Sequence, residues 1–147
     1  MTNKPPQDTR LTAALLNLAH HVLHLFAEVG RTHNLSQQQV EMICAVIVRD
    51  RVRMTELGRL LHLEKSNLSN LVDRAERRGL VVRTRDPDDR RATWVELTDE
   101  GTRLAMQTYD EVSARLHRLI HHLPPEEQEH LTAVVEQILA KEALQAG

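Results

Sequence analysis

Residues 83–101 read RTRDPDDRRATWVELTDEG, and the first half of this stretch sets four arginines and three aspartates around one proline. The runs LVVRT and TWVELT on either side are rich in β-branched residues. Asp-Pro and Asp-Asp mark a turn between them. The pattern predicts a β-hairpin with a strongly charged tip.

Two short helices precede this hairpin. TELGRLLH begins at Thr55, which we expect to cap its helix, and KSNLSNLVDRAERRG follows a turn at residues 62–64. Gly58 predicts a close approach of the two helices, and Gly79 a left-handed stop. RDRVRM, before the first helix, reads as a connector. Two helices and a hairpin in this order predict a winged helix-turn-helix, a module that lays its second helix in the DNA major groove.

The second helix has the composition that this role requires. Four apolar side chains at helical spacing form its buried face, and the opposite face is polar. Small hydroxyl and amide groups can approach base edges, and Lys65 at the positive helix end suits a phosphate. An ordinary solvated face is the alternative. The expected DNA-binding residues of this helix are Lys65, Ser66, Asn67, Ser69, Asn70 and Arg74.

The hairpin tip suits the DNA minor groove, where arginine is the favoured cation. Asp89 lies two residues before Arg91 and is expected to hold that arginine by charge-assisted hydrogen bonds, which leaves Arg90 for phosphate. Asp86 with Pro87 is expected to set the turn. A charge-neutralised surface loop is the alternative. The expected DNA-binding residues of the hairpin are Arg83, Arg85, Asp89, Arg90 and Arg91.

The rest of the chain is predicted to be helical. Of its 147 residues 41% are apolar but only 2% aromatic, which favours helices packed on helices. An apolar stripe predicts a helix over residues 11–29, and Ser36 with Gln39 forms a capping box for the next. Thr98 is expected to cap a long helix to about residue 122, and Pro125 to begin the last. The expected fold is mainly α with a small β-hairpin wing.

Charge and composition restrict the partners and the location. Residues 49–91 hold 12 of the 19 basic residues but only 8 of the 21 acidic ones, although the whole chain has a net charge of −2. A basic middle indicates a polyanionic partner for that part alone. The polar start MTNKPPQDTR is not a secretory leader, and no apolar run could span a bilayer. The single cysteine, Cys44, suits a reducing compartment. We therefore expect a cytoplasmic protein.

Residues 35–101, LSQQQVEMI…MTELGRLLHLEKSNLSNLVDRAERRGLVVRTRDPDDRRATWVELTDEG, resemble the multiple antibiotic resistance regulator (MarR) family of transcription factors, most specifically in DPDDRRA and VELTDEG. The resemblance implies a homodimer that binds a pseudo-palindromic operator, usually as a repressor. It implies a DNA-binding lobe at residues 35–98, with 1–34 and 99–147 forming a shared dimerisation domain. It also makes Arg91 the minor-groove arginine and Asp89 its orienting partner.

The dimer has support from the residues themselves. The amphipathic stretches 11–29 and 104–144 carry wide apolar faces that one central three-helix module cannot cover. Pairing of two chains would bury the surplus. It would also set two recognition helices about one DNA turn, ~34 Å, apart.

The signal that controls DNA binding is left open. An anionic aromatic effector held by Arg10, His20 or His24 is one alternative, and family members often bind such ligands. Metal binding by the one-turn pairs His20/His24 and His117/His121 is a second. Oxidation of Cys44 is a third, although a buried thiol with a raised pKa is a poor sensor. No cofactor is expected.

Two other classes of function compete with DNA binding. A histidine-metal hydrolase lacks support, because the chain has no Ser/His/Asp order, no paired-carboxylate cleft and no phosphate-binding glycine loop. We therefore expect no enzyme activity. A winged helix that contacts another protein would not need the Asp89/Arg91 pair.

Overall fold

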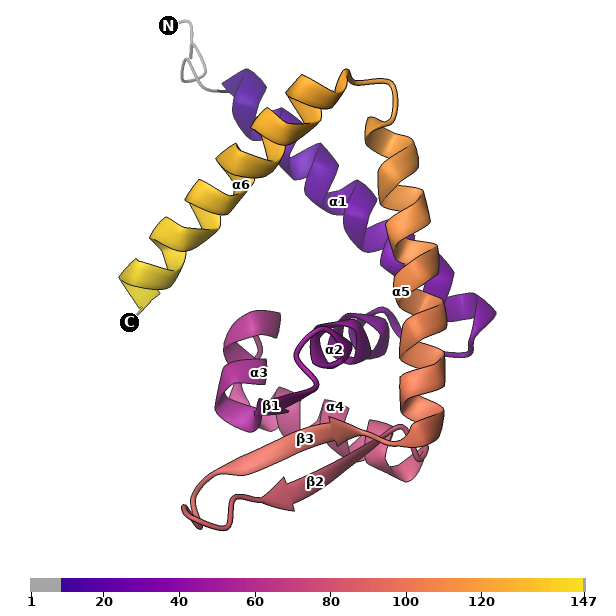
Figure 1. Ribbon diagram of the computed structural model, residues 1–147, viewed down its shortest axis with the longest axis vertical. Helices are drawn as coiled ribbons and strands as arrows, with labels where there is room; N and C mark the ends of the chain where they lie inside the picture. Colours follow the sequence, from indigo (N-terminus) through magenta and orange to yellow (C-terminus); the bar gives the residue numbers. More distant parts are fainter. Residues whose placement is uncertain (1–8, 147) are drawn as a thin grey trace, which may run out of the picture. The chain divides into compact units, whose positions relative to one another are not determined.

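The computed structural model describes residues 9–146, which form six helices and a three-stranded antiparallel sheet (Figure 1). The chain divides into two compact units, Met1–Val112 and Ser113–Gly147. Helix α5 belongs to both, and each unit is described by itself below. The expected fold class, mainly α with a hairpin wing, is confirmed.

Helix α1 spans Thr9–Thr32. Its apolar stripe is buried only near the C-terminal end, at Leu25 and Val29. There Gly30 lets the helix meet the following loop, because a Cβ at this position would lie 2.5 Å from the carbonyl oxygen of Leu35. The stripe continues toward the N-terminal end with exposed leucines at positions 11, 15, 16, 18 and 23.

Helix α2 spans Gln37–Ile47 and begins with the predicted capping box. Ser36 Oγ accepts a hydrogen bond from the backbone amide of Gln39 at 3.1 Å, and Gln39 Oε1 accepts one from the amide of Ser36 at 2.9 Å. Two of the helix's otherwise unpaired amides are thereby satisfied. Fully buried side chains of α2, Val40, Met42, Ile43 and Val46, form the centre of the core.

Helices α3 (Met54–Leu61) and α4 (Lys65–Arg77) form the predicted helix-turn-helix. His62 makes the turn in the left-handed conformation, with φ of 53°. A Cβ on Gly58 would lie 3.3 Å from Leu68 Cδ2, which confirms the close approach of the helices at this glycine. The expected cap at Thr55 is wrong: the N-cap is Arg53, without a side-chain hydrogen bond, because the preceding strand runs directly into the helix.

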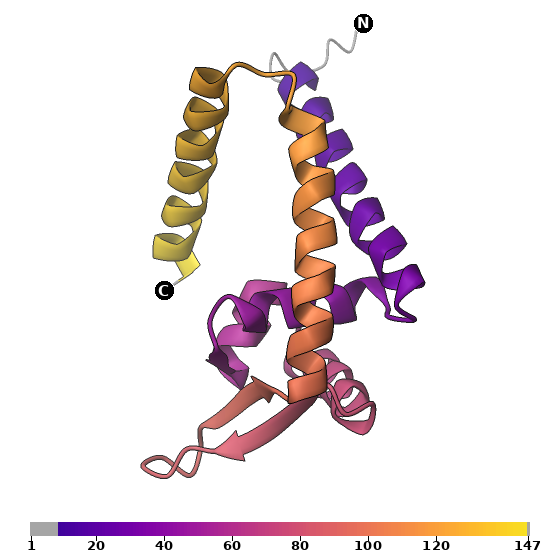
Figure 2. The ribbon, with the colours of Figure 1, turned by 45° about the vertical axis from the view of Figure 1, so that its right-hand side comes forward.

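The sheet has the order β1-β3-β2, with β1 at Arg51–Arg53, β2 at Val81–Arg85 and β3 at Thr93–Leu97. The hairpin β2–β3 matches the sequence prediction, and Figure 2 shows its tip projecting beyond the helices of its unit. The expectation of a connector at RDRVRM is wrong, because Arg51 pairs with Glu96 and Arg53 with Trp94 to form a third strand. Val52, Val81 and Val95 give the sheet its buried face.

Helix α5 spans Asp99–Ile120 and is capped as predicted, since Thr98 Oγ1 accepts a hydrogen bond from the amide of Gly101 at 3.0 Å. A Cβ on Gly101 would lie 1.9 Å from the carbonyl oxygen of Leu80, so only glycine fits where the helix crosses the start of the hairpin. Leu104, Ala105 and Val112 join α5 to the core.

Helix α6 spans Pro125–Ala146, with Pro125 at its first position as predicted. Gln128 Nε2 donates to the carbonyl of Leu123 at 2.9 Å and so ties the helix to the preceding turn. Over the described residues, no helix is both long enough and apolar enough to cross a membrane. The apolar side chains of α6 remain exposed, and the largest are Leu131, Val134, Val135, Ile138, Leu139 and Leu144.

Candidate nucleic-acid interface

Helix α4 presents the polar face that the sequence predicts. Leu68, Leu71, Val72 and Ala75 are buried, so the helix is anchored along one side. The N-cap residue, Glu64, makes no side-chain cap hydrogen bond, which leaves the first-turn amides without a side-chain partner. Of the predicted recognition residues, Ser69 is half-buried and the others are exposed: Lys65, Ser66, Asn67, Asn70 and Arg74.

The aspartates of the hairpin tip shape its backbone. Asp86 Oδ1 accepts a hydrogen bond from the amide of Asp88 at 2.9 Å, and Asp89 Oδ1 accepts one from the amide of Arg91 at 3.0 Å. The amide of Asp86 donates to the carbonyl of Ala92 at 3.0 Å and closes the loop. These side-chain bonds to an amide two residues on are Asx-type turns. The expected role of Asp86 in setting the turn is confirmed.

Asp89 holds Arg91 differently from the expectation. Its carboxylate binds the backbone amide of Arg91, and among the described residues no ion pair joins the two side chains. Asp89 therefore fixes the direction in which the backbone presents the Arg91 side chain. Arg85, Arg90 and Arg91 are all exposed.

Arg83 has a different setting from the other hairpin arginines. Its guanidinium binds the carboxylates of Asp73 and, at 3.2 Å, Glu76 on α4, and its backbone amide donates to Glu76 at 3.3 Å. The hydrogen bond to Asp73 is the main reason why the pKa of Arg83 is raised above its ordinary value. With these contacts Arg83 ties the hairpin to the recognition helix, whereas the sequence placed it among the DNA contacts.

A second cluster lies where β1 meets the hairpin. Asp86 Oδ2 accepts hydrogen bonds from Arg53 Nη2 at 3.1 Å and from Trp94 Nε1 at 3.2 Å. The guanidinium carbon of Arg51 lies 4.0 Å from the centroid of the Trp94 ring, and that of Arg53 lies 4.9 Å from it. The backbone hydrogen bond from Asp88, with help from Trp94 and Arg53, holds the pKa of Asp86 below its ordinary value.

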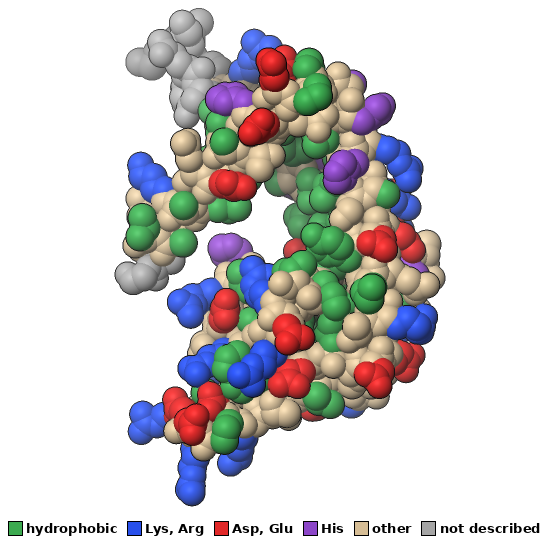
Figure 3. Space-filling view, in the orientation of Figure 1, with side chains coloured by type: hydrophobic (Ala, Val, Ile, Leu, Met, Phe, Trp, Pro, Cys, Tyr) green, Lys and Arg blue, Asp and Glu red, His purple; other side chains and the backbone are tan. Residues whose placement is uncertain are grey.

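The sequence interpretation missed Arg51, Arg53 and Trp94 in this role. The alternation of exposed Arg51, buried Val52 and exposed Arg53 is the signal of a short strand. Figure 3 shows Lys and Arg side chains gathered over α3 and the hairpin, with Asp and Glu between them. Asp73, Glu76, Asp86 and Asp89 bind groups within the protein, and exposed cations remain at the hairpin tip and along α4.

The residues considered for effector or metal binding lie on helix surfaces. Arg10, His20 and His24 are exposed on α1, and His24 Nε2 lies 2.5 Å from Glu28 Oε1. His117 Nδ1 on α5 lies 2.8 Å from the carbonyl oxygen of Ser113, and His121 Nδ1, just after the end of α5, lies 2.8 Å from that of Arg118. Within residues 9–146 no three His, Cys, Asp or Glu side chains come together as a metal site would require.

Cys44 is half-buried, with its Sγ 3.9 Å from Thr108 Oγ1. Burial raises the pKa of the thiol, and the contact with Thr108 offsets part of that effect. The expected raised pKa is confirmed. A thiol that resists ionisation is a slow nucleophile, so this setting favours a packing role over redox sensing.

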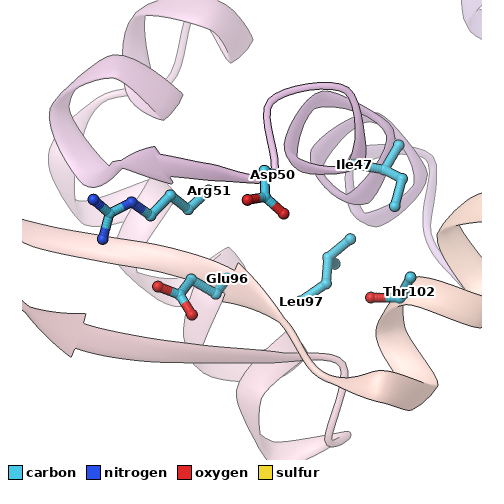
Figure 4. A pocket seen from close by; sticks show the side chains of 6 residues that line it. All are labelled: Ile47, Asp50, Arg51, Glu96, Leu97 and Thr102. Atoms are coloured by element: carbon cyan, nitrogen blue, oxygen red, sulfur yellow. The ribbon is translucent and has the colours of Figure 1, made fainter.

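A small pocket of about 200 Å³ lies where the end of α2, the sheet and the start of α5 meet (Figure 4). The Leu97 side chain points toward Ile47 in this pocket, and the guanidinium of Arg51 points away from it. Sites for drug-sized ligands usually measure about 300–1,000 Å³. The pocket is lined by Ile47, Asp50, Arg51, Glu96, Leu97 and Thr102, and none of the predicted effector residues is among them.

An exposed polar helix after a three-residue turn, beside a hairpin with a basic tip, defines a winged helix-turn-helix DNA-binding protein. Comparison with known proteins shows which family this part of the chain resembles. A model described as MarR family matches residues 33–92. The homoprotocatechuate degradative operon repressor of Escherichia coli is 25% identical over 130 residues, which are 88% of each chain. Over residues 33–92 the chain is thus similar to the MarR family, and its relatives include transcriptional regulators.

Solved structures agree with this fold. NadR in complex with 4-hydroxyphenylacetate superposes with a TM-score of 0.82 at 21% identity, over 94% of this chain and 97% of the other. A mutant MarR from E. coli in complex with operator DNA gives a TM-score of 0.76 at 21% identity, over 92% and 99% of the two chains. At this identity, the likeness speaks for the fold alone.

Proposed function

We propose that the protein is a cytoplasmic repressor that binds a pseudo-palindromic operator as a homodimer and releases it when a small anionic aromatic effector binds. The observation that carries DNA binding is the exposed polar face of α4 beside a cationic hairpin tip. Residues 35–98 would form the DNA-binding lobe. Residues 1–34 and 99–147 would form the dimerisation domain.

Each half of the interface has its own part in this proposal. Asn67 and Asn70 can form paired hydrogen bonds with adenine in the major groove, and Lys65 and Arg74 can neutralise phosphates. Arg91 would enter the adjacent minor groove, where the negative potential of narrow segments attracts arginine. Arg90 would contact the backbone beside it.

Uncovered apolar surface supports the proposed homodimer. Five leucines in the N-terminal part of α1 are exposed, and so is the apolar face of α6. Large exposed apolar patches on a protein mark interaction sites. Self-association through these faces would bury them at about 25 cal/mol per Å² and would place two copies of α4 on one side of a duplex.

Repression and effector control are supported by what similar proteins are called. The E. coli relative is named as a repressor of an aromatic degradation operon, and the NadR structure contains an aromatic carboxylate. In this chain Arg10, His20 and His24 fall on one face of α1 by their helical spacing. We propose that Arg10, His20 or His24 binds the anionic ligand, and no metal is required.

A direct experiment measures binding to duplexes selected from random DNA by fluorescence anisotropy. The parent should bind with nanomolar to sub-micromolar affinity that falls steeply with salt, because phosphate contacts release counterions. Adding 4-hydroxyphenylacetate as the probe effector should weaken binding in the parent and not in the Arg10→Ala/His20→Ala/His24→Ala variant. Salt-independent binding would contradict DNA recognition. An equal effect of the probe on both proteins would contradict the effector site.

A further inference from the structure

The outer face of the wing sheet carries a cluster that joins three separate segments. Arg53 comes from β1, Trp94 from β3 and Asp86 from the first position of the hairpin loop. Trp94 Nε1 and Arg53 Nη2 donate to the same carboxylate oxygen of Asp86, at 3.2 and 3.1 Å. The other oxygen accepts the amide of Asp88 at 2.9 Å. The loop is thereby fastened to the strand outside the hairpin.

The carboxylate of this cluster is less exposed to solvent than that of an ordinary surface ion pair. The Asp86 side chain is only 10% exposed, against 47% for Arg53. Because the carboxylate is largely shielded from water and accepts three donors, it is held in one orientation. The Trp94 ring is also covered by the Arg51 guanidinium, 4.0 Å from its centroid. A two-stranded hairpin alone is marginally stable, so its tip depends on such attachments.

We propose that Asp86, Trp94 and Arg53 act as positioning residues that hold the wing tip, and with it Arg90 and Arg91, in the conformation that enters the minor groove. This inference rests on the proposed function of the wing as a DNA contact. Asp86 begins the loop, and Asp89 sets the direction of Arg91 three residues after Asp86. A fixed start of the loop and a fixed turn within it leave the tip little freedom. Binding then requires little further ordering of the backbone, which is where a flexible wing would lose affinity.

Arg53 is also a cation, and a direct phosphate contact would be the alternative role. The two roles differ in their dependence on salt. Removing a phosphate contact reduces the slope of log K against log salt by about 0.9, whereas removing a positioning contact lowers affinity at every salt concentration and leaves the slope unchanged. Arg53 has its guanidinium against Asp86 and the Trp94 ring, which favours positioning.

The test uses the full chain and one selected operator duplex across a salt series. Arg53→Met keeps the aliphatic stem and Asp86→Asn keeps an acceptor for the amide of Asp88. Each should lower affinity about tenfold, comparable to the cost of ordering one residue, with an unchanged salt slope. The double variant should lose little more than the single ones, because both break one network. Arg103→Met, on the exposed side of α5, is the control and should bind as the parent does.

A second readout separates positioning from loss of fold. Amide hydrogen exchange at residues 86–92 of the free protein should be faster in Arg53→Met, while the thermal midpoint and the exchange of α4 stay as in the parent. A salt slope reduced by about 0.9 in Arg53→Met overturns the inference in favour of a phosphate contact. If Arg53→Met binds DNA as the parent does while Arg91→Ala binds weakly, the positioning role of the network is contradicted and the proposed wing contact is not. Parental binding by Arg91→Ala overturns the proposed wing contact and the network's purpose together.

Discussion

The carboxylate of Asp89 accepts a hydrogen bond from the backbone amide of Arg91 at 3.0 Å and makes no ion pair with its guanidinium in the part of the chain that the structure describes. Asp89, beside the arginine that we propose for the minor groove, thus acts on the backbone. What Asp89 needs for this role is an acceptor oxygen, and its negative charge is secondary.

This relationship predicts a difference between two substitutions of Asp89. Asp89→Asn retains the acceptor and should bind operator DNA nearly as the parent does. Asp89→Ala loses the bond, worth about 1 kcal/mol, and should bind about fivefold more weakly. Anisotropy titrations at one salt concentration measure both. Equal losses in the two variants would mean that the charge of Asp89, and not its acceptor, is what matters.

The recognition helix predicts a sequence-specific effect. Asn70 is exposed on α4, one turn after Ser66, and its amide can bind adenine in a bidentate manner. Asn70→Ala should cost about 1–3 kcal/mol at one base pair and bind the remaining sequence as before. Selection of duplexes from a random library by parent and variant would show it as one relaxed position. Lys65→Ala is the matched comparison, since loss of a phosphate contact should weaken all sequences alike.

The exposed apolar faces predict how the dimer is broken. Leu15 is 53% exposed on α1 and Ile138 is 54% exposed on α6. Burying a carboxylate without a partner is costly, so Leu15→Glu and Ile138→Glu should each shift the protein toward monomer. Light scattering after size-exclusion chromatography measures this, and Gln38→Glu on the polar surface of α2 serves as the control. A parent that is monomeric at micromolar concentration would contradict the proposed assembly.

Lowering the pH should break the contacts that ionised Asp86 makes in the wing. The pKa of Asp86 is lowered in the folded protein. Its contribution to the stability of the folded wing is therefore fully present above the unfolded-state pKa of about 3.9 and is lost as the pH falls through the lower folded-state pKa. Trp94 is the only tryptophan of the chain, and its fluorescence reports the contact with Asp86 directly. We expect its emission to change only below about pH 3.9, and Asp86→Asn to lack this change. A parental transition centred well above that pH would assign it to another group.

Local signals were sufficient for most of the fold. The capping box at Ser36, the left-handed stop at Gly79 and the proline at the start of α6 all act within a few residues, and the structure confirms each. Strand β1 could not be predicted in the same way. It is three residues long, and its partner Glu96 lies 45 positions further along the chain. Without that strand, the N-cap of α3 was placed two residues late, at Thr55 instead of Arg53.

The candidate site, too, could be predicted only in part from the sequence. The exposed face of α4 was predictable from helical spacing, because the buried positions fix which side faces outward. The setting of Arg83 was also readable: with a period of two it shares the face of buried Val81, and hence looks toward α4. The cluster of Arg53, Trp94 and Asp86 depends on the register of two strand pairs, and no local pattern contains that information.

Hydroxyl-radical footprinting of the protein on a selected operator, together with native mass spectrometry of the same complex, tests the central proposal most directly. Two chains on one duplex should protect two segments centred about 10 base pairs, or ~34 Å, apart, with minor-groove protection beside each. A single protected segment occupied by one chain would contradict the account.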